Sequence, residues 1–220
     1  MKIYKFSLFI FIYSIFIISS SQAQKIGIRG GGNLTTIIGK DVLPYVTPHF
    51  SYNGGLYVEF PYTRNSSTQL EINYIKKGAT MRDSIAMFYD AYYEVNEKLD
   101  YISLPAIFKL KLGNKKFDLY TDWGVALNML ISSKRTLYGE NMNMPFNAEG
   151  YYSQELKKYE VDAIFGIGMR FKNTTMDIRY NAAISNLYGG DSPFTARNNA
   201  VTLNFAVQLH KIVQKTKYRW

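Results

Sequence analysis

The sequence predicts an all-β fold, an eight-stranded antiparallel up-and-down transmembrane β-barrel. Eight segments between Lys25 and His210 alternate apolar with polar residues. Most are about 9 to 14 residues long, and a tilted membrane strand needs about 9–11. Connections of about 12 to 26 residues alternate with connections of about 3 to 6. Outer-membrane barrels have short periplasmic turns and long outer loops, whereas a soluble barrel, the alternative fold, has no physical reason to collect its long loops at one end.

A secretory signal is predicted ahead of the first strand. Met1–Lys5 holds two lysines, Phe6–Ile18 is an apolar run, and Ser21 and Ala23 form a small-x-small site. This order is typical of a signal peptide, and we predict cleavage after Ala23. The apolar run is shorter than the roughly 20 residues of a spanning helix, which disfavours the alternative of an uncleaved anchor. The predicted division is signal peptide 1–23, barrel 24–210 and basic C-terminal tail 211–220.

The first four predicted strands place apolar residues at every second position. They are Lys25–Asn33, Tyr52–Phe60, Thr68–Lys77 and Tyr101–Leu112. Successive side chains of a strand point to opposite faces, so each segment has one apolar and one polar face. The run Gly30–Gly32 is interpreted as a flexible exit from the first strand, because no lysine and helix follow it as in a phosphate-binding loop. Pro61 ends the second strand, since proline cannot donate to the ladder.

The last four predicted strands have the same alternation. They are Phe117–Leu130, Tyr159–Phe171, Thr175–Ala183 and Ala200–His210. The tetrapeptide Gly113–Lys116 precedes the fifth strand, and Lys172–Thr174 separates the sixth from the seventh. Both contain residues that favour turns.

The polar face of these strands carries nearly balanced charges and several glycines. Small residues alternating with long charged ones suit the interior of a narrow barrel, while glycine only weakens a strand whose face meets water. We therefore place the charged face inside and the apolar face toward lipid. Because side chains fill an eight-stranded barrel, we predict a structural charge network in its interior. Its predicted members are Arg29, Glu59, Glu71, Lys109, Asp122, Asp162, Arg170, Asp177 and Arg179.

Charge and cysteine content narrow the class of protein. The net charge of +9 falls to +7 without Lys2 and Lys5, and most basic residues lie in the predicted short turns and tail. This basic side either attracts acidic lipid headgroups or an acidic periplasmic partner, or forms a solvated rim. Nucleic-acid binding is not expected, since the basic residues form no recognition motif in an exported chain. The chain has no cysteine, so closed strand pairing has to hold the fold without disulfides.

Candidate catalytic residues are few. The two histidines, His49 and His210, fall at opposite predicted ends of the barrel and cannot share a metal. His49 with Ser51 or Asp41 is the one combination that suits a surface hydrolase, but a lone loop histidine is more often a solvated residue. Zinc-protease and phosphate-loop motifs are absent from the sequence. We predict no enzyme activity, no cofactor and no metal.

Two sets of aromatic residues leave alternatives open. The first set is Tyr52, Tyr74, Tyr101, Trp123 and Tyr180. These residues are expected to form girdles at the membrane interface or to fill the barrel wall, in preference to a sugar site. The second set lies in the Met- and aromatic-rich stretch Met81–Tyr93 of a predicted long loop. That stretch is either a strand extension above the membrane or a contact for a ligand or partner.

Five segments resemble the outer-membrane β-barrel family common in Bacteroidetes, whose members are called PorT-like or porin family proteins. They are Lys25–Leu34, Tyr101–Lys109, Leu119–Leu130, Asp177–Asn181 and Ser185–Leu187. Their order and spacing along the mature chain carry the resemblance. It implies a small outer-membrane barrel with no catalytic residues to carry over. The chain departs from the family pattern at Ser103, where a glutamate is usual, and in continuing to Trp220 beyond the last strand.

The leading functional hypothesis is a non-enzymatic outer-membrane barrel with a side-chain-filled interior. Its role would be structural, adhesive or accessory within an envelope assembly. The alternative is a small passive pore for ions or small solutes, and an enzyme at the outer surface comes third. The expected partners are outer-membrane lipid and a periplasmic or envelope protein.

Overall fold

A computed structural model of the chain describes residues 24–40, 45–84, 92–112, 118–140, 156–189 and 195–212. The predicted signal peptide and residues 213–220 of the predicted tail lie outside these ranges. Within them, the chain has no helix long and apolar enough to cross a membrane.

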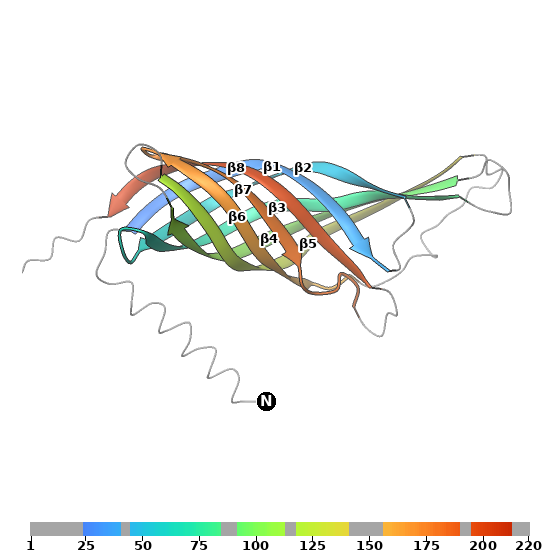
Figure 1. Cartoon of the computed structure of the whole chain (residues 1–220). Coiled ribbons are helices and arrows are strands. Elements are labelled where there is room, and N and C mark those ends of the chain that lie inside the picture. The colour runs from blue at the N-terminus through green and yellow to red at the C-terminus, as the bar shows by residue number, and fades with distance from the viewer. Residues whose placement is uncertain are drawn as a thin grey trace, which may run out of the picture.

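Eight antiparallel strands form a closed barrel (Figure 1). They are β1 (Gln24–Gly39), β2 (Tyr45–Pro61), β3 (Ser66–Ser84), β4 (Tyr92–Lys111), β5 (Asp118–Glu140), β6 (Tyr159–Phe171), β7 (Thr174–Ala183) and β8 (Ala196–Ile212). Each strand pairs with the next in sequence, and β8 pairs with β1 from Gln24↔Ile212 to Gly39↔Ala196. The predicted all-β, eight-stranded up-and-down barrel is confirmed.

The barrel has two distinct ends. The β2–β3, β4–β5 and β6–β7 turns lie at one end together with the start of β1 and the end of β8 (left in Figure 1). We call it the short-turn end. The other four connections lie at the opposite, long-loop end, where β3, β4 and β5 project beyond the remaining strands.

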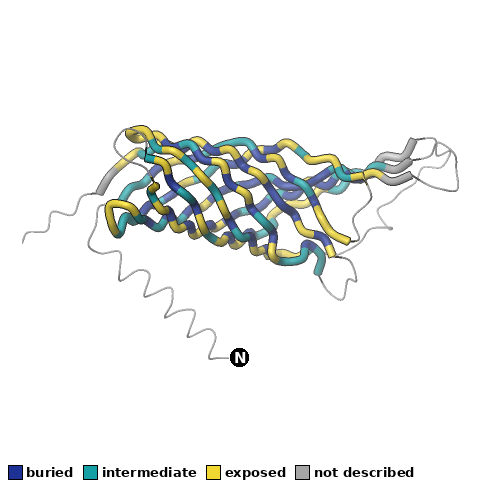
Figure 2. The backbone as a smooth tube through the Cα atoms, in the orientation of Figure 1, coloured by how far each residue is buried: buried dark blue, intermediate teal, exposed yellow. Residues whose placement is uncertain are grey.

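Buried and exposed residues alternate along the strands, as Figure 2 shows in blue and yellow. The exposed face is apolar, while most buried positions in the middle of the barrel are polar or charged. Representative exposed side chains are Ile28, Leu56, Ile72, Leu104, Trp123, Phe165, Ile178 and Phe205. The charged face is therefore the inner face. This arrangement is the reverse of a soluble barrel, whose polar face meets water.

Most strands are longer than their predicted ranges, and three of them have their extensions at the projecting part of the long-loop end. β3 continues past Lys77, β4 begins before Tyr101, and β5 continues past Leu130. The register of β4 and β5 shifts between Asp100 and Tyr101, and Ile131 is the extra residue. A bulge of this kind reverses which residues face inward. The simple alternation is therefore broken at the positions where the predicted strands stop.

The strand extensions take up part of the Met81–Tyr93 stretch. Met81 lies in β3 and is buried, and Tyr92 and Tyr93 lie in β4. For these three residues the first of the two alternatives, a strand extension, is confirmed. Residues 85–91 of the stretch lie outside the described ranges.

Gly78 allows β3 to continue beyond its predicted end. Its φ of +143° lies in a region that strains an L side chain. A Cβ atom on Gly78 would also lie 2.0 Å from the carbonyl oxygen of Glu97. The glycine is therefore required by both the backbone conformation and the close approach of β4.

The prediction that Gly30–Gly32 leads out of the first strand is wrong. The three glycines lie inside β1, which continues to Gly39. A Cβ atom on Gly31 would lie 1.9 Å from the carbonyl oxygen of Leu203 in β8. The missing side chain thus lets β1 and β8 approach closely where they close the barrel.

Candidate functional site

Two arginines link four strands across the middle of the lumen. Arg179 on β7 contacts three carboxylates: its Nη1 lies 2.8 Å from Glu71 Oε1, and its Nε lies 2.7 Å from Asp122 Oδ2 and 3.0 Å from Asp177 Oδ1. Arg29 on β1 pairs with Glu71, and its Nη2 lies 3.1 Å from Asp177 Oδ1. All five side chains are almost completely buried.

Lys109 completes this group, which we call the central network: Arg29, Glu71, Lys109, Asp122, Asp177 and Arg179. The ammonium nitrogen of Lys109 lies 3.6 Å from Asp122 Oδ1 and 4.1 Å from the centre of the Tyr120 ring. Three positive and three negative charges therefore face one another in the lumen. A buried charge is tolerated when it is paired and hydrogen-bonded in this way.

Neutral side chains use the remaining hydrogen-bonding capacity of the carboxylates. Asn73 Nδ2 donates to Glu71 Oε2 at 2.7 Å, and Asn204 Nδ2 donates to Asp177 Oδ1 at 2.9 Å. The Tyr120 hydroxyl donates to Asp177 Oδ2 at 3.4 Å. These contacts orient the carboxylates toward the two guanidinium groups.

Glycines opposite large side chains make room for the central network. A Cβ atom on Gly168 would lie 2.5 Å from the Tyr120 ring, and one on Gly166 would lie 2.8 Å from Arg179 Cγ. The same relation holds between Gly27 and the Tyr57 ring, at 2.5 Å. Inward-facing glycines are thus positions over which a neighbouring large side chain lies, as expected for a narrow barrel.

A second ionic group lies nearer the long-loop end. The ammonium group of Lys77 lies 2.5 Å from Glu160 Oε1 and 2.7 Å from Asp162 Oδ2. The Tyr101 hydroxyl donates to Glu160 Oε2 at 3.3 Å. We call these four residues the Lys77 cluster. A cavity of about 30 Å³ separates it from the central network, with Asp162, Arg29 and Arg179 among its lining residues.

Apolar side chains close the lumen beyond the Lys77 cluster. This apolar cap contains Ile37, Ile75, Ala79, Met81, Val95, Leu99, Tyr101, Leu187 and Ala196. Strand residues alone supply most of it, but Leu187 comes from the β7–β8 connection and is 1 % exposed. The cap therefore depends on a connection that folds back into the barrel mouth.

The backbone around Leu187 is held by specific hydrogen bonds. The Ser185 hydroxyl accepts from the Val161 N–H at 2.9 Å, and the Asn186 side-chain oxygen accepts from the Ala196 N–H at 2.9 Å. The Leu187 N–H donates to the Ala196 carbonyl at 2.7 Å. Three consecutive residues that the sequence indicated as a motif, Ser185–Leu187, thus position the apolar side chain in the cap.

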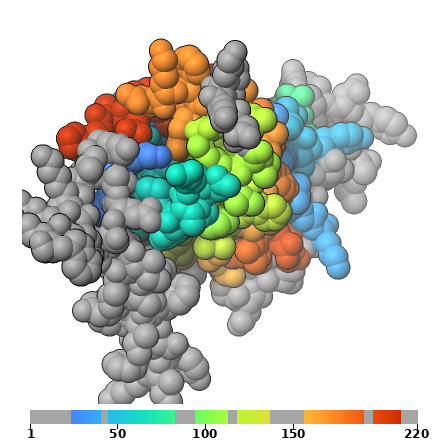
Figure 3. All heavy atoms as spheres, turned by 60° about the vertical axis from the view of Figure 1, so that its left-hand side comes forward, coloured from blue at the N-terminus to red at the C-terminus, as the bar shows by residue number. Residues whose placement is uncertain are grey.

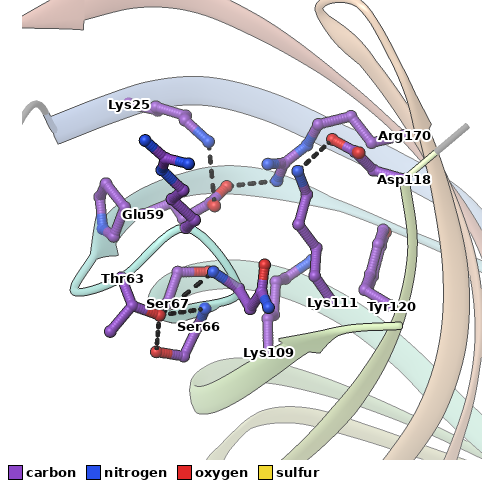
Figure 4. Close-up of a pocket in the computed structure, with 13 residues that line it drawn as sticks. Lys25, Glu59, Thr63, Ser66, Ser67, Lys109, Lys111, Asp118, Tyr120 and Arg170 are labelled. Carbon is purple, nitrogen blue, oxygen red and sulfur yellow. Dashed lines mark hydrogen bonds and ion pairs between the residues drawn. The ribbon is translucent and has the colours of Figure 1, made fainter. Parts of the chain in front are cut away.

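The short-turn end is lined by charged groups instead. Glu59 lies between two cations, with Oε1 3.2 Å from Lys25 Nζ and Oε2 2.5 Å from Arg170 Nη2 (Figure 4). Lys111 Nζ lies 2.6 Å from Asp118 Oδ2. These groups surround a cavity of about 70 Å³, which Arg64, Ser66, Ser67, Lys109 and Tyr120 also line. We call the cavity and its lining the short-turn mouth.

The structure separates the nine residues predicted to form one network. Six of them form the central network, while Glu59 and Arg170 lie at the short-turn mouth. Asp162 belongs to the Lys77 cluster. Sequence reasoning left Lys77 and Glu160 out of the network, although both lie on the predicted inner face. Their ion pair spans strands far apart in sequence, so no local signal indicates it.

The aromatic residues divide between the two faces. Tyr52, Trp123 and Tyr180 are exposed on the outer face, where Trp123 packs edge-on against Phe165 with ring centres 5.4 Å apart. Tyr101 is fully buried in the lumen. Because Tyr101 is buried, it cannot belong to a girdle at the membrane interface, which was one of the two roles predicted for these residues.

The two histidines are at opposite ends, as predicted. His49 pairs with Thr35 near the long-loop end, and His210 pairs with Ile26 near the short-turn end. They therefore cannot act on one metal or one substrate.

Comparison with known proteins identifies the fold family. Residues 19–189 match the outer membrane protein β-barrel domain family. The chain belongs to this family. A search of curated proteins finds no match. The protein is thus an outer-membrane β-barrel, and its exposed apolar face lies against membrane lipid.

Solved outer-membrane structures are similar in fold at low sequence identity. Ail, the attachment invasion locus protein of Yersinia pestis, has a TM-score of 0.42 and 12% identity over 86% of this chain and 99% of that one. Neisserial surface protein A has a TM-score of 0.47 and 8% identity over 85% and 99%. OprG of Pseudomonas aeruginosa has a TM-score of 0.40 and 11% identity over 87% and 99%.

The family match ends at the β7–β8 connection of this outer membrane β-barrel protein. It includes Ser185–Leu187 and stops before β8 begins at Ala196. The structure nevertheless places β8 between β7 and β1, where it completes the barrel. The strand outside the match is therefore required for closure.

Proposed function

We propose that the protein is a non-enzymatic, non-conducting barrel with a structural, adhesive or accessory role in an envelope assembly. The observation that carries the proposal is the filled lumen. The central network, the Lys77 cluster and the apolar cap lie one after another along the barrel axis. Each offers a different obstacle to a hydrated ion.

Passage through the central network would require its ion pairs to part. Arg179 alone contacts three carboxylates on β3, β5 and β7. Separating such groups leaves uncompensated buried charges, which is costly. The network therefore favours a permanently closed barrel over a gated one.

Passage through the apolar cap would require hydration of its side chains. Ile37, Leu99 and Leu187 are each at most 1 % exposed. Hydrophobic constrictions prevent ion flow because water leaves them. Both obstacles would have to be absent for the barrel to act as a porin.

Planar-bilayer recording of the purified, refolded protein tests the proposal. Wild-type protein is expected to show no stable open state at either voltage polarity. A heat-modifiable gel shift provides the control that the recorded protein is folded. A large, stable conductance from folded wild-type protein would contradict the proposal.

A small passive pore is the second candidate, and the lumen cavities favour it. The cavities of about 70 and 30 Å³ are large enough for several waters. The side-chain amides of Asn128 and Asn198 also have no hydrogen-bond partner within the described residues, and such groups commonly bind internal water. Small, steady currents sensitive to substitution of Asn128 would support this candidate against the first.

Sidedness and processing are part of the same proposal. We place the short-turn end in the periplasm and the signal cleavage after Ala23, as the sequence predicts. We also propose the PorT-like affiliation, which rests on the order and spacing of the five segments Lys25–Leu34, Tyr101–Lys109, Leu119–Leu130, Asp177–Asn181 and Ser185–Leu187. A periplasmic or envelope protein is the proposed partner. N-terminal sequencing of the mature protein tests the cleavage site.

A hydrolytic activity that His49→Ala abolishes would contradict the non-enzymatic assignment.

A further inference from the structure

The short-turn mouth has more positive charge than its own carboxylates neutralise. Its carboxylates are Glu59 and Asp118, and its cations are Lys25, Arg64, Lys111 and Arg170, besides Lys109, which is counted with Asp122 in the central network. In contrast, the three cations of the central network face three carboxylates. The mouth thus retains an excess of two positive charges at the edge of the lumen.

Arg64 supplies one of these charges from a turn that is held by hydrogen bonds. It has no salt bridge with any described residue and lines the cavity. Thr63 Oγ1 accepts from the N–H groups of Asn65 and Ser66 at 3.1 and 3.0 Å, and the Lys111 N–H donates to the Asn65 carbonyl at 2.7 Å. Figure 3 turns this end toward the viewer, and the teal segment around the turn lies beside the lime-green ends of β4 and β5. The guanidinium group is therefore carried by a backbone that is already fixed against β4.

Lys109 also lines this cavity. Its side chain is buried, and its ammonium group is beyond hydrogen-bond distance of Asp122, at 3.6 Å. Contact with the Tyr120 ring stabilises the cation through the ring face and requires no hydrogen bond from the ammonium group. Lys109 therefore retains N–H donors at the cavity lining.

The donors fit a small oxyanion. The cavity volume of about 70 Å³ is about five times the roughly 10–15 Å³ that one water needs. Guanidinium and ammonium groups, with the hydroxyls of Ser66 and Ser67, are the donors that bind phosphate oxygens. Glu59 already occupies the gap between Lys25 and Arg170 (Figure 4), so an added anion would bind near Arg64, Lys109 and Lys111. Lys111 would then share its ammonium group between the anion and Asp118.

We propose that the short-turn mouth is a phosphate-binding site, formed by Arg64, Lys109 and Lys111 with the hydroxyls of Ser66 and Ser67. The phosphate belongs either to free inorganic phosphate or to the headgroup of an anionic phospholipid at the rim of the barrel. The site is independent of whether the lumen conducts, so it stands apart from the closed-barrel proposal.

Amide NMR shifts of Tyr62–Ser67 in lipid nanodiscs test the site and distinguish the two sources. Inorganic phosphate is titrated into protein in phosphatidylcholine nanodiscs. The same shifts are then compared in nanodiscs of equal parts phosphatidylcholine and phosphatidylglycerol. Saturable shifts with inorganic phosphate identify the free anion, and shifts seen only with phosphatidylglycerol identify the headgroup.

The double variant Arg64→Gln/Lys111→Gln is expected to weaken binding by about tenfold or more, because it removes two charged hydrogen-bond donors. Both positions are at the rim, and the remaining barrel shifts report whether the variant is folded. Arg197→Gln is the matched control: Arg197 is exposed on β8 near the long-loop end, and its replacement is expected to leave binding unchanged. The proposal is overturned if neither probe shifts the turn, or if the double variant responds like the wild type.

Discussion

The long-loop end of the lumen is closed by apolar side chains, whereas the short-turn end is lined by charges around a cavity. Leu187 and eight other residues form the apolar cap. Four cations and two carboxylates form the rim of the short-turn mouth. The difference indicates that the two ends have separate tasks. The apolar cap excludes water from the long-loop end, and the short-turn mouth presents charged groups that can bind a ligand.

The central network lies between these ends and resembles neither. Its charges are balanced, its carboxylates are hydrogen-bonded by Asn73 and Asn204, and little exposed surface remains. Charge at the middle of the barrel is therefore balanced within the fold, while the short-turn mouth keeps an excess of positive charge. Substitutions in the three regions are expected to lower the free energy of unfolding by different amounts. Measuring these losses tests whether the regions differ as described.

The largest effect is expected from Arg179→Ala. The substitution leaves Glu71, Asp122 and Asp177 with fewer cations in a buried lumen. Breaking a buried pair costs about 3–5 kcal/mol. We expect the free energy of unfolding, measured by urea titration in detergent, to fall by about this amount. The control is Ile178→Ala, a lipid-facing neighbour on β7. Equal losses in both variants would show that the central network does not stabilise the barrel.

The next largest effect is expected from Leu187→Ala in the apolar cap. A Leu→Ala change at a fully buried site costs about 2–5 kcal/mol, because it removes packed atoms and leaves a cavity. Urea unfolding measures the loss, and amide hydrogen exchange of Lys157 and Ala196 reports local opening. Their N–H groups hydrogen-bond to Leu187 O at 2.8 Å and to Asn186 Oδ1 at 2.9 Å. Unchanged exchange together with unchanged stability would contradict a cap that depends on Leu187.

A smaller effect is expected from Gly168→Ala. The added methyl would lie 2.5 Å from the Tyr120 ring, and overpacking of this kind costs about 1–3 kcal/mol. Gly30→Ala is the control, because the nearest atom to its added methyl lies 3.4 Å away. Combining Gly168→Ala with Tyr120→Leu should recover part of the loss. The packing relation is refuted if Gly30→Ala proves as costly as Gly168→Ala.

The smallest effect is expected from Arg82→Gln. Arg82 Nε lies 2.6 Å from Glu94 Oε2, but the arginine side chain is 56% exposed. Exposed ion pairs contribute below about 1 kcal/mol. The same urea titration should therefore barely distinguish this variant from the wild type. A loss comparable to that of Arg179→Ala would remove the distinction between buried and exposed pairs.

Alternation along each strand, together with the alternating connection lengths, predicted the barrel, and the glycines and balanced charges of the polar face predicted that this face lies inside. Side chains such as Asp177 and Arg179, two residues apart, share a face by strand geometry alone. Their partners could not be assigned in this way. Arg179 contacts Glu71 and Asp122 across the lumen, and those contacts depend on barrel closure rather than on sequence separation.

The apolar cap and most of the strand extensions were missed for local reasons. Leu187 lies in a connection without periodicity, and its contacts come from distant strands. Near Ala79 and Leu99 the inner face becomes apolar, so the contrast between the faces disappears. The bulge at Ile131 then shifts the period. Each feature removes the signal on which strand prediction rests.

Single-channel recording across a planar bilayer tests the closed lumen most directly. Folded wild-type protein is compared with the double variant Arg179→Ala/Leu187→Ala, which removes one side chain from the central network and one from the apolar cap. We predict no stable open state for the wild type and measurable openings for the double variant. A stable open state of the wild type, with the same conductance as the double variant, would contradict the closed-barrel account.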